Sequence, residues 1–136
     1  MAGARISIYY KENWGDCLLI IEPQVLAQVA VEAAEEKKAM DITVLNIGGV
    51  SVVAEYFVIC SSRSPVHARA IAEEIEKRLQ QLNVARPRRE GLRTGQWVLL
   101  DYGSVVVHIF QEEQRRFYNL EHLWGDAPVV RSPISI

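Results

Sequence analysis

The stretch Gln96–Phe110, QWVLLDYGSVVVHIF, decides the fold. Two apolar runs flank Tyr102-Gly103, a pattern typical of a β-hairpin with a two-residue turn. That turn pairs Trp97 with His108, Leu99 with Val106, and Asp101 with Ser104. Because side chains alternate along a strand, these six residues share one face, and the other face holds Val98, Leu100, Val105, Val107 and Ile109. The sequence therefore predicts a sheet with one aliphatic face and one face that carries Trp, His, Asp and Ser.

Helical and strand-like patterns alternate on the N-terminal side of this hairpin. A proline favours the first turn of a helix, and both expected helices begin at one. Ser64 is in addition a good N-cap for the second, because its oxygen can accept an unpaired backbone N–H. The expected elements are a helix from Pro23 that ends at Asp41, strands over Ile42–Ile47 and Glu55–Cys60, and a helix over Pro65–Leu82.

The C-terminal side adds one more helix. The spacing of Phe117, Leu120 and Trp124 predicts a helix over Glu112–Trp124, with Gly125 just beyond its end. The order α-β-β-α-β-β-α predicts an α/β fold, a mixed β-sheet flanked by helices. We expect three parts: an N-terminal extension over residues 1–20, one domain over 21–125, and a C-terminal tail over 126–136. Residues 83–95, with a proline and two glycines, are expected to form a loop.

Composition narrows the class of protein. The chain has 136 residues, of which 49% are hydrophobic and 24% charged, as in a single folded domain. No apolar run approaches the roughly 20 residues of a membrane helix, and we expect no secretory signal in Met1–Tyr10, which has one arginine and no apolar core. Two cysteines without a CxxC spacing favour a reducing, cytoplasmic setting. A net charge of −2 gives no global reason to bind nucleic acid or a membrane surface.

We find no catalytic set or metal site in the sequence. The three histidines lack the spacing of zinc ligands, and nothing local supports a nucleophile built from Cys60 and His108. Nucleotidyltransferases follow a Gly-Ser turn with two metal-binding carboxylates on the next strand, whereas Gly103-Ser104 is followed by Val-Val-Val-His-Ile. We therefore expect no enzyme activity, no metal and no cofactor.

Basic and aromatic side chains are the remaining candidates for binding. Four arginines, Arg86, Arg88, Arg89 and Arg93, gather in the expected loop. A solvated loop is the default interpretation, and contact with RNA phosphates is the alternative. Large aromatic rings are typical interface anchors, although core packing is the default for any single ring. We expect Trp124 in the core and Trp97 and Tyr118 as surface anchors.

Two motifs, Trp97–Phe110 and FYNLEHLW over Phe117–Trp124, closely resemble the ribosomal silencing factor family, RsfS or Iojap. The resemblance covers about residues 24–125. It implies a nucleotidyltransferase-like topology without catalytic residues, and a homodimer. It also implies binding to the large-subunit ribosomal protein numbered fourteen, which blocks joining of the small subunit and so represses translation. A ribosome-assembly factor that contacts ribosomal RNA and a nucleotidyltransferase-like enzyme are the alternatives.

The family motif falls on Trp97, Asp101, Gly103, His108, Arg116, Tyr118, Leu120, Glu121, Leu123 and Trp124. The chain departs from it at Gly103-Ser104, where Gly-Asp is usual, and at Ala54-Glu55, where Thr-Asp is usual. The first departure removes a carboxylate from the expected binding face. We expect the partner-binding residues to be Trp97, Leu99, Asp101, Tyr102, His108, Arg116, Tyr118 and Glu121.

Overall fold

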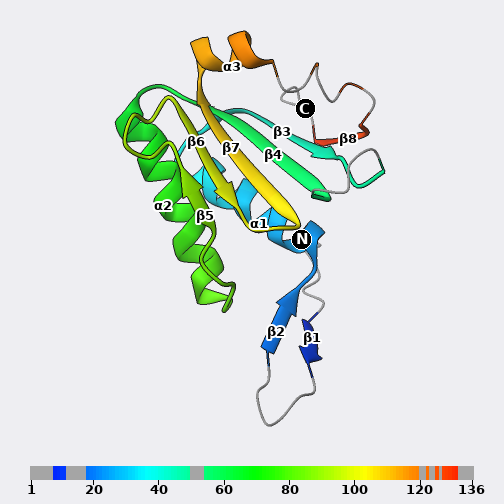
Figure 1. Ribbon diagram of the computed structural model, residues 1–136. Coiled ribbons are helices and arrows are strands. Elements are labelled where there is room, and N and C mark those ends of the chain that lie inside the picture. The colour runs from blue at the N-terminus through cyan, green and yellow to red at the C-terminus, as the bar shows by residue number, and fades with distance from the viewer. Residues whose placement is uncertain are drawn as a thin grey trace.

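The chain is described here from a computed structural model, which covers residues 8–11, 18–49, 54–119, 122, 125 and 127–131. Within these residues a mixed sheet of six strands has the order β5-β6-β7-β4-β3-β8 (Figure 1). The strands are β3 (Met40–Asn46), β4 (Tyr56–Ser62), β5 (Arg88–Glu90), β6 (Trp97–Asp101), β7 (Val105–Gln111) and β8 (Val129–Arg131). Only β4 and β7 pair in parallel; the other neighbours are antiparallel. The predicted mixed sheet is confirmed.

The helices are α1 (Pro23–Glu36), α2 (Pro65–Gln81) and α3 (Glu112–Tyr118). None of the described helices is long and apolar enough to cross a membrane. A separate antiparallel pair, β1 (Ile8–Lys11) and β2 (Leu18–Ile21), precedes α1; it spans the expected N-terminal extension over residues 1–20 and runs one residue beyond it.

Both long helices begin where their prolines predict. Ser64 caps α2, and its hydroxyl oxygen accepts the backbone N–H of His67 at 3.0 Å. The end of α1 differs from the prediction, because the helix stops at Glu36 rather than at Asp41. Lys38 has a φ of 63°, in the left-handed region that terminates a helix, and Asp41 already belongs to β3.

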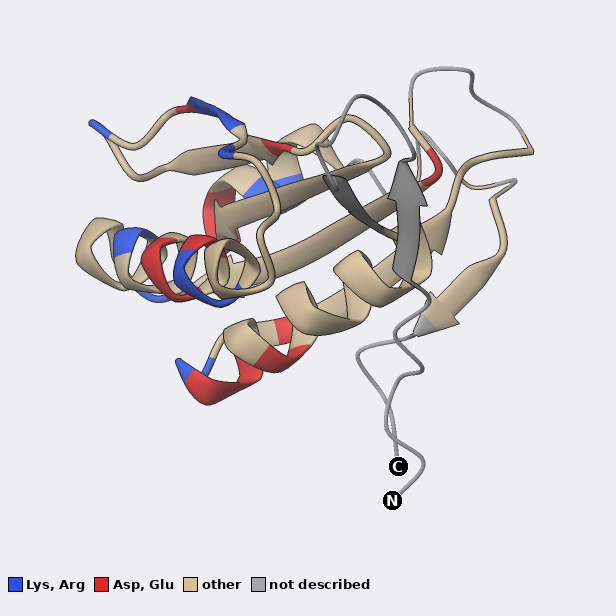
Figure 2. Ribbon diagram, turned by 90° about the horizontal axis from the view of Figure 1, so that it is seen from below, with Lys and Arg blue, Asp and Glu red and all other residues tan. Residues whose placement is uncertain are grey.

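Helices α1 and α2 pack on the same side of the sheet (Figures 1 and 2). The larger core cluster joins them to the aliphatic face of the central strands, including Val58, Cys60, Val98, Leu100, Val105, Val107 and Ile109. A smaller cluster on the opposite face uses no residue of α1 or α2. It contains Leu45, Ile47, Ala54, Phe57, Ile59, Val106, Phe110 and Ala127. The predicted division between the two faces of the hairpin is therefore confirmed, but the two long helices cover only one of them.

The hairpin register differs from the prediction by two residues. Trp97 lies opposite Phe110, and Leu99 lies opposite His108. The two-residue turn is Gly103-Ser104, closed by a hydrogen bond from the Tyr102 N–H to the Val105 carbonyl. A shift of two leaves the strand side chains on their predicted faces, because side chains alternate with a period of two. Ser104 is the exception: it was expected opposite Asp101 but lies in the turn, and Val106 takes that place.

Two edge strands lie where the sequence predicted none. The expected loop over residues 83–95 contains β5, whose Arg88 lies opposite Asp101 of β6. The expected tail over 126–136 contains β8, which pairs with β3. Both strands are only three residues long, with charged or exposed side chains, so the alternation that marks a buried strand is missing.

Helix α3 is also shorter than the helix predicted over Glu112–Trp124. It ends at Tyr118, because Asn119 adopts a left-handed φ of 46° and its N–H bonds to the Arg115 carbonyl. Phe117, the first residue of the spacing that predicted this helix, is 80% exposed. Leu120 and Trp124, the other two residues of that spacing, lie outside the described residues, and so the expected core position of Trp124 is not tested.

The turn after β5 gives a stability prediction at Gly91. This residue has a φ of +81°, and an added Cβ would lie 1.9 Å from the Trp97 carbonyl oxygen. We expect Gly91→Ala to lower the free energy of unfolding by about 2–4 kcal/mol, from backbone strain plus the clash. Urea denaturation measures this loss.

Gly103→Ala is the matched control. Gly103 has a similar φ of +88°, but an added Cβ there meets nothing within 4 Å. This variant should lose only the cost of the strained backbone, about 1–2 kcal/mol. If the two variants lost equal amounts of unfolding free energy, the close approach of Gly91 to β6 would not be the cause of the larger loss expected for Gly91→Ala.

Candidate functional site

The candidate site is the face of β6 and β7 that α1 and α2 leave uncovered. We call it the Trp97 face, and define it by Trp97, Leu99, Asp101, Val106 and His108, which alternation and register place together. Its three β6 residues are half-buried, whereas its two β7 residues are buried. The face thus offers partly accessible side chains on a rigid, well-packed base.

Trp97 connects this face to the end of α3. Its indole Nε1–H donates to Nδ1 of His108 at 3.1 Å. Its ring lies 4.8 Å from the ring of Phe110 and 4.6 Å from that of Tyr118, measured between centroids. Such contacts fix the indole in one orientation at low cost in side-chain entropy, which is what an interface anchor requires.

His108 is a neutral residue in this environment. Burial lowers its pKa to about 4, although the nearby carboxylate of Asp101 acts in the opposite direction. Because Nδ1 accepts the hydrogen bond from the indole N–H, the neutral imidazole carries its own proton on Nε2. Nε2 is buried and has no hydrogen-bond partner among the described residues. The ring of Phe57 packs edge-on at 4.7 Å. His108 is therefore arranged to orient Trp97, not to exchange protons near neutral pH.

Arg115 holds α3 across one end of the same face. Its guanidinium donates to the Asp41 carbonyl at 2.6 Å, the Ser61 hydroxyl at 2.8 Å and the Thr43 hydroxyl at 3.2 Å. These bonds attach α3 to the ends of β3 and β4 and so place Tyr118 beside Trp97. The exposed ring of Phe117 lies 5.0 Å from that of Tyr118, which extends the aromatic surface outward.

The structure brings together five of the eight expected binding residues, namely Trp97, Leu99, Asp101, His108 and Tyr118. Asp101 also stabilises the hairpin, because its Oδ1 accepts the Gly103 N–H at 2.8 Å. Arg116 is exposed on α3. Glu121 lies outside the described residues.

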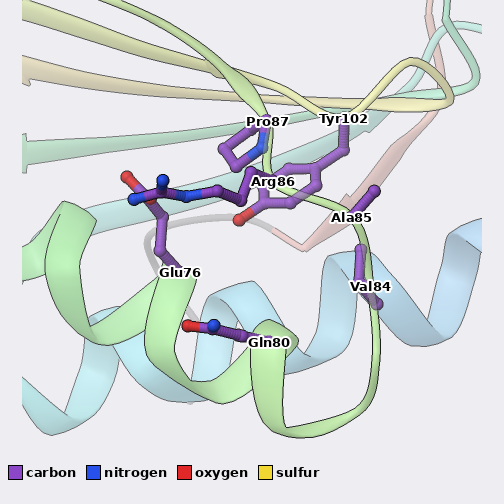
Figure 3. Close-up of a pocket in the computed structure, with 7 residues that line it drawn as sticks. All are labelled: Glu76, Gln80, Val84, Ala85, Arg86, Pro87 and Tyr102. Atoms are coloured by element: carbon purple, nitrogen blue, oxygen red, sulfur yellow. The ribbon is translucent and has the colours of Figure 1, made fainter.

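Tyr102 is separated from the others, on the helix side of the sheet. Its ring packs against the larger core cluster and lines a small hollow with Glu76, Gln80, Val84, Ala85, Arg86 and Pro87 (Figure 3). Burial raises the pKa of its hydroxyl, which has no hydrogen-bond partner among the described residues. The hollow measures about 30 Å³, enough for one water molecule but not for a small-molecule ligand.

The described residues hold no cluster of three or more His, Cys, Asp or Glu side chains suited to a metal ion. Cys60 and His108 cannot act as a nucleophile and base pair, because Cys60 packs against the helices while His108 lies on the opposite face. Burial also raises the pKa of the Cys60 thiol to about 12, so the thiolate is scarce at neutral pH.

Three phenylalanines that were not among the expected binding residues also lie in this region. Phe57 comes from β4, Phe110 from the end of β7, and Phe117 from α3. Phe57 and Ile59, two residues apart on β4, share the face opposite the long helices. Only the parallel pairing of β4 with β7, which is a long-range contact, places Phe57 against His108.

The lowered pKa of His108 gives a pH-dependent prediction. The unfolded chain, with a histidine pKa near 6.5, binds the proton before the folded protein does, so folding stability falls as the pH drops from 6.5 to 4. His108→Gln removes this titration. We expect the stability of the unsubstituted protein relative to this variant to fall by about 2–3 kcal/mol between pH 7 and pH 4.5, measured by urea denaturation. A difference independent of pH would contradict the burial of a neutral imidazole.

The chain is similar in sequence to a known protein family. The family model described as "Ribosomal silencing factor during starvation" matches residues 20–135. Two bacterial proteins named ribosomal silencing factor RsfS are similar: one from Halalkalibacterium halodurans is 46% identical over 79% of this chain and 92% of its own length, and one from Bacillus subtilis is 42% identical over 77% and 89%.

The solved structures agree with the sequence relatives. A crystal structure of a protein from Chromobacterium violaceum superposes with a TM-score of 0.74 at 32% identity, covering 76% of this chain and 87% of the other. One from Bacillus halodurans gives 0.70 at 42% identity, covering 79% and 98%. The matched family model spans most of the chain, and close relatives cover it over nearly their full length; the chain belongs to the ribosomal silencing factor family.

Proposed function

We propose that this chain represses translation by binding the large ribosomal subunit through its Trp97 face and sterically blocking the small subunit. The partner on the large subunit is the ribosomal protein numbered fourteen. The observation that carries the proposal is the partly exposed aromatic surface, in which Trp97 is half-buried, Tyr118 is 47% exposed and Phe117 is 80% exposed. Membership of the ribosomal silencing factor family supports the ribosome as the binding partner.

The residue types on this surface suit a protein partner. Each large ring can bury about 150–250 Å² of surface, and tryptophan, tyrosine and arginine are enriched among residues that dominate binding energy. Trp97 and Tyr118 are already held in place by each other, so little ordering entropy is lost on binding. Asp101 and Arg116 supply polar groups that fix the orientation of the partner.

The proposed mechanism requires occupancy, not chemistry. A bound domain of this size prevents two subunits from meeting as long as it stays in place, so the protein acts without enzyme activity or a cofactor. The action takes place where ribosomes assemble, in the cytoplasm. If a homodimer uses the same face, self-association and subunit binding compete, and dilution favours binding.

Trp97→Ala tests the face directly. Loss of an interface anchor typically costs at least about 2 kcal/mol, so affinity for purified large subunits should fall more than about thirtyfold. Co-sedimentation over a range of protein concentrations measures this change. Unchanged affinity in a folded variant would show that the partner binds elsewhere.

Phe117→Ala provides a test that leaves the fold intact, because its ring is mostly exposed. We expect it to weaken subunit binding about tenfold without changing the free energy of unfolding. Val66→Ala is the matched control, since Val66 is also exposed, at 69%, but lies at the start of α2. Equal effects of the two substitutions on subunit binding would argue against a specific role for the aromatic surface.

A further inference from the structure

A basic edge borders the Trp97 face. The segment Arg86–Arg93 holds four arginines and one glutamate, a net charge of +3 in eight residues, whereas the whole chain carries −2. All four arginine side chains are exposed. Figure 2 shows this charge gathered along β5 and the loops beside it, at one margin of the sheet.

Little of this charge is neutralised within the described part of the chain. Arg89 makes a long ion pair with Glu76 of α2, at 3.7 Å. Arg86, Arg88 and Arg93 form no ion pair with any described residue. A cluster of like charges without partners is destabilising in itself, so its presence at one edge calls for a function outside the folding of the domain.

The segment is held firmly, unlike the solvated loop that is the default for such a cluster. β5 pairs with β6, and Gly91 approaches the Trp97 carbonyl too closely for any side chain. The guanidinium of Arg69 donates to the carbonyls of Leu92 and Arg93 at 3.1 and 3.3 Å. The backbone that carries the arginines is therefore preorganised, which lowers the entropy lost when they bind a partner.

From this geometry we infer that the β5 edge binds RNA phosphates. Arginine presents a planar fork of donors that matches the oxygens of a phosphate, and an edge strand projects such groups to both sides. Arg88 lies opposite Asp101 and so projects toward the Trp97 face, whereas Arg89 projects toward α2. Within Arg86–Arg93 there is no aromatic residue to stack on a base, so the contact follows the backbone and is independent of sequence.

This inference rests on the proposed function, because the phosphates would be those of RNA beside the bound ribosomal protein. β5 is the direct neighbour of β6, so a partner seated on Leu99 and Trp97 lies next to Arg88. The chain would then recognise a composite surface of protein and RNA. A chain that needs both the ribosomal protein and the adjacent RNA binds the assembled large subunit more tightly than it binds the free ribosomal protein.

The test removes the three unpaired charges together, as Arg86→Gln, Arg88→Gln and Arg93→Gln. Affinity is measured for purified large subunits and, separately, for the isolated ribosomal protein numbered fourteen, at several salt concentrations. For the subunit we expect at least a tenfold loss of affinity, and a slope of log affinity against log salt smaller by roughly 2–3. For the isolated protein we expect no change.

Two control variants sharpen the result. Lys37→Gln, Lys38→Gln and Arg63→Gln remove the same number of exposed charges from a separate open groove at the start of α2, and should leave the slope unchanged. Arg86→Lys, Arg88→Lys and Arg93→Lys keep the charge, and should retain most of the slope.

Each alternative outcome is distinct. If the unsubstituted protein binds subunits and the glutamine variant binds equally well with the same slope, the RNA contact is wrong while the proposed function stands. If the variant also loses affinity for the isolated ribosomal protein, the arginines contact protein, which overturns the inference. If the unsubstituted protein binds no subunits, both proposals fail.

Discussion

The parallel pairing of β4 with β7 is the constraint on which the other features depend. Parallel neighbours need a long connection between them, and α2 forms the helical part of that connection, on the face that α1 also covers. Both central strands are then buried along nearly their whole length. The opposite face receives only the short helix α3 among the described helices, so its aromatic residues remain partly accessible. The one-sided placement of the long helices thus leaves a face free for binding.

A single polar pair determines the character of that face. His108 occupies a buried position that an aliphatic residue could fill, and its Nε2 is left without a partner among the described residues. An unsatisfied buried donor costs about 1–3 kcal/mol, which is a substantial part of a small domain's stability. However, the Nδ1 of His108 accepts a hydrogen bond from the indole of Trp97 and so fixes its orientation. Tyr118, on the helix α3 that Arg115 attaches to the sheet, packs against the same indole. Stability is given up here for a preorganised surface.

Much of this arrangement is readable from local pattern. The starts of α1 and α2, the two faces of the hairpin and the absence of metal-binding carboxylates after Gly103 follow from residue types and spacing. The predicted faces of the strands are correct although the predicted register is wrong by two residues. A shift of two residues returns each side chain to the same face of the sheet. The two motifs Trp97–Phe110 and Phe117–Trp124 together indicated the family, and the family in turn implied a function. No single residue of the chain indicates that function by itself.

The rest depends on contacts that a local pattern does not contain. The edge strands β5 and β8 are short and exposed, so pairing with their neighbours, not burial, makes them strands. The spacing of Phe117 with Leu120 and Trp124 predicted a longer helix, but the left-handed backbone at Asn119 ends α3 at Tyr118. Tyr102 was expected to bind a partner as a large aromatic ring at the hairpin turn. In the structure it packs against the core on the helix side of the sheet.

The most direct test of the central claim is the rate of subunit joining. Large subunits are incubated with the protein, small subunits are added, and light scattering follows the formation of joined ribosomes. Steric exclusion predicts that joining slows in proportion to the fraction of large subunits occupied, and that Trp97→Ala restores the normal rate. Normal joining on large subunits shown to be fully occupied by the protein would contradict it.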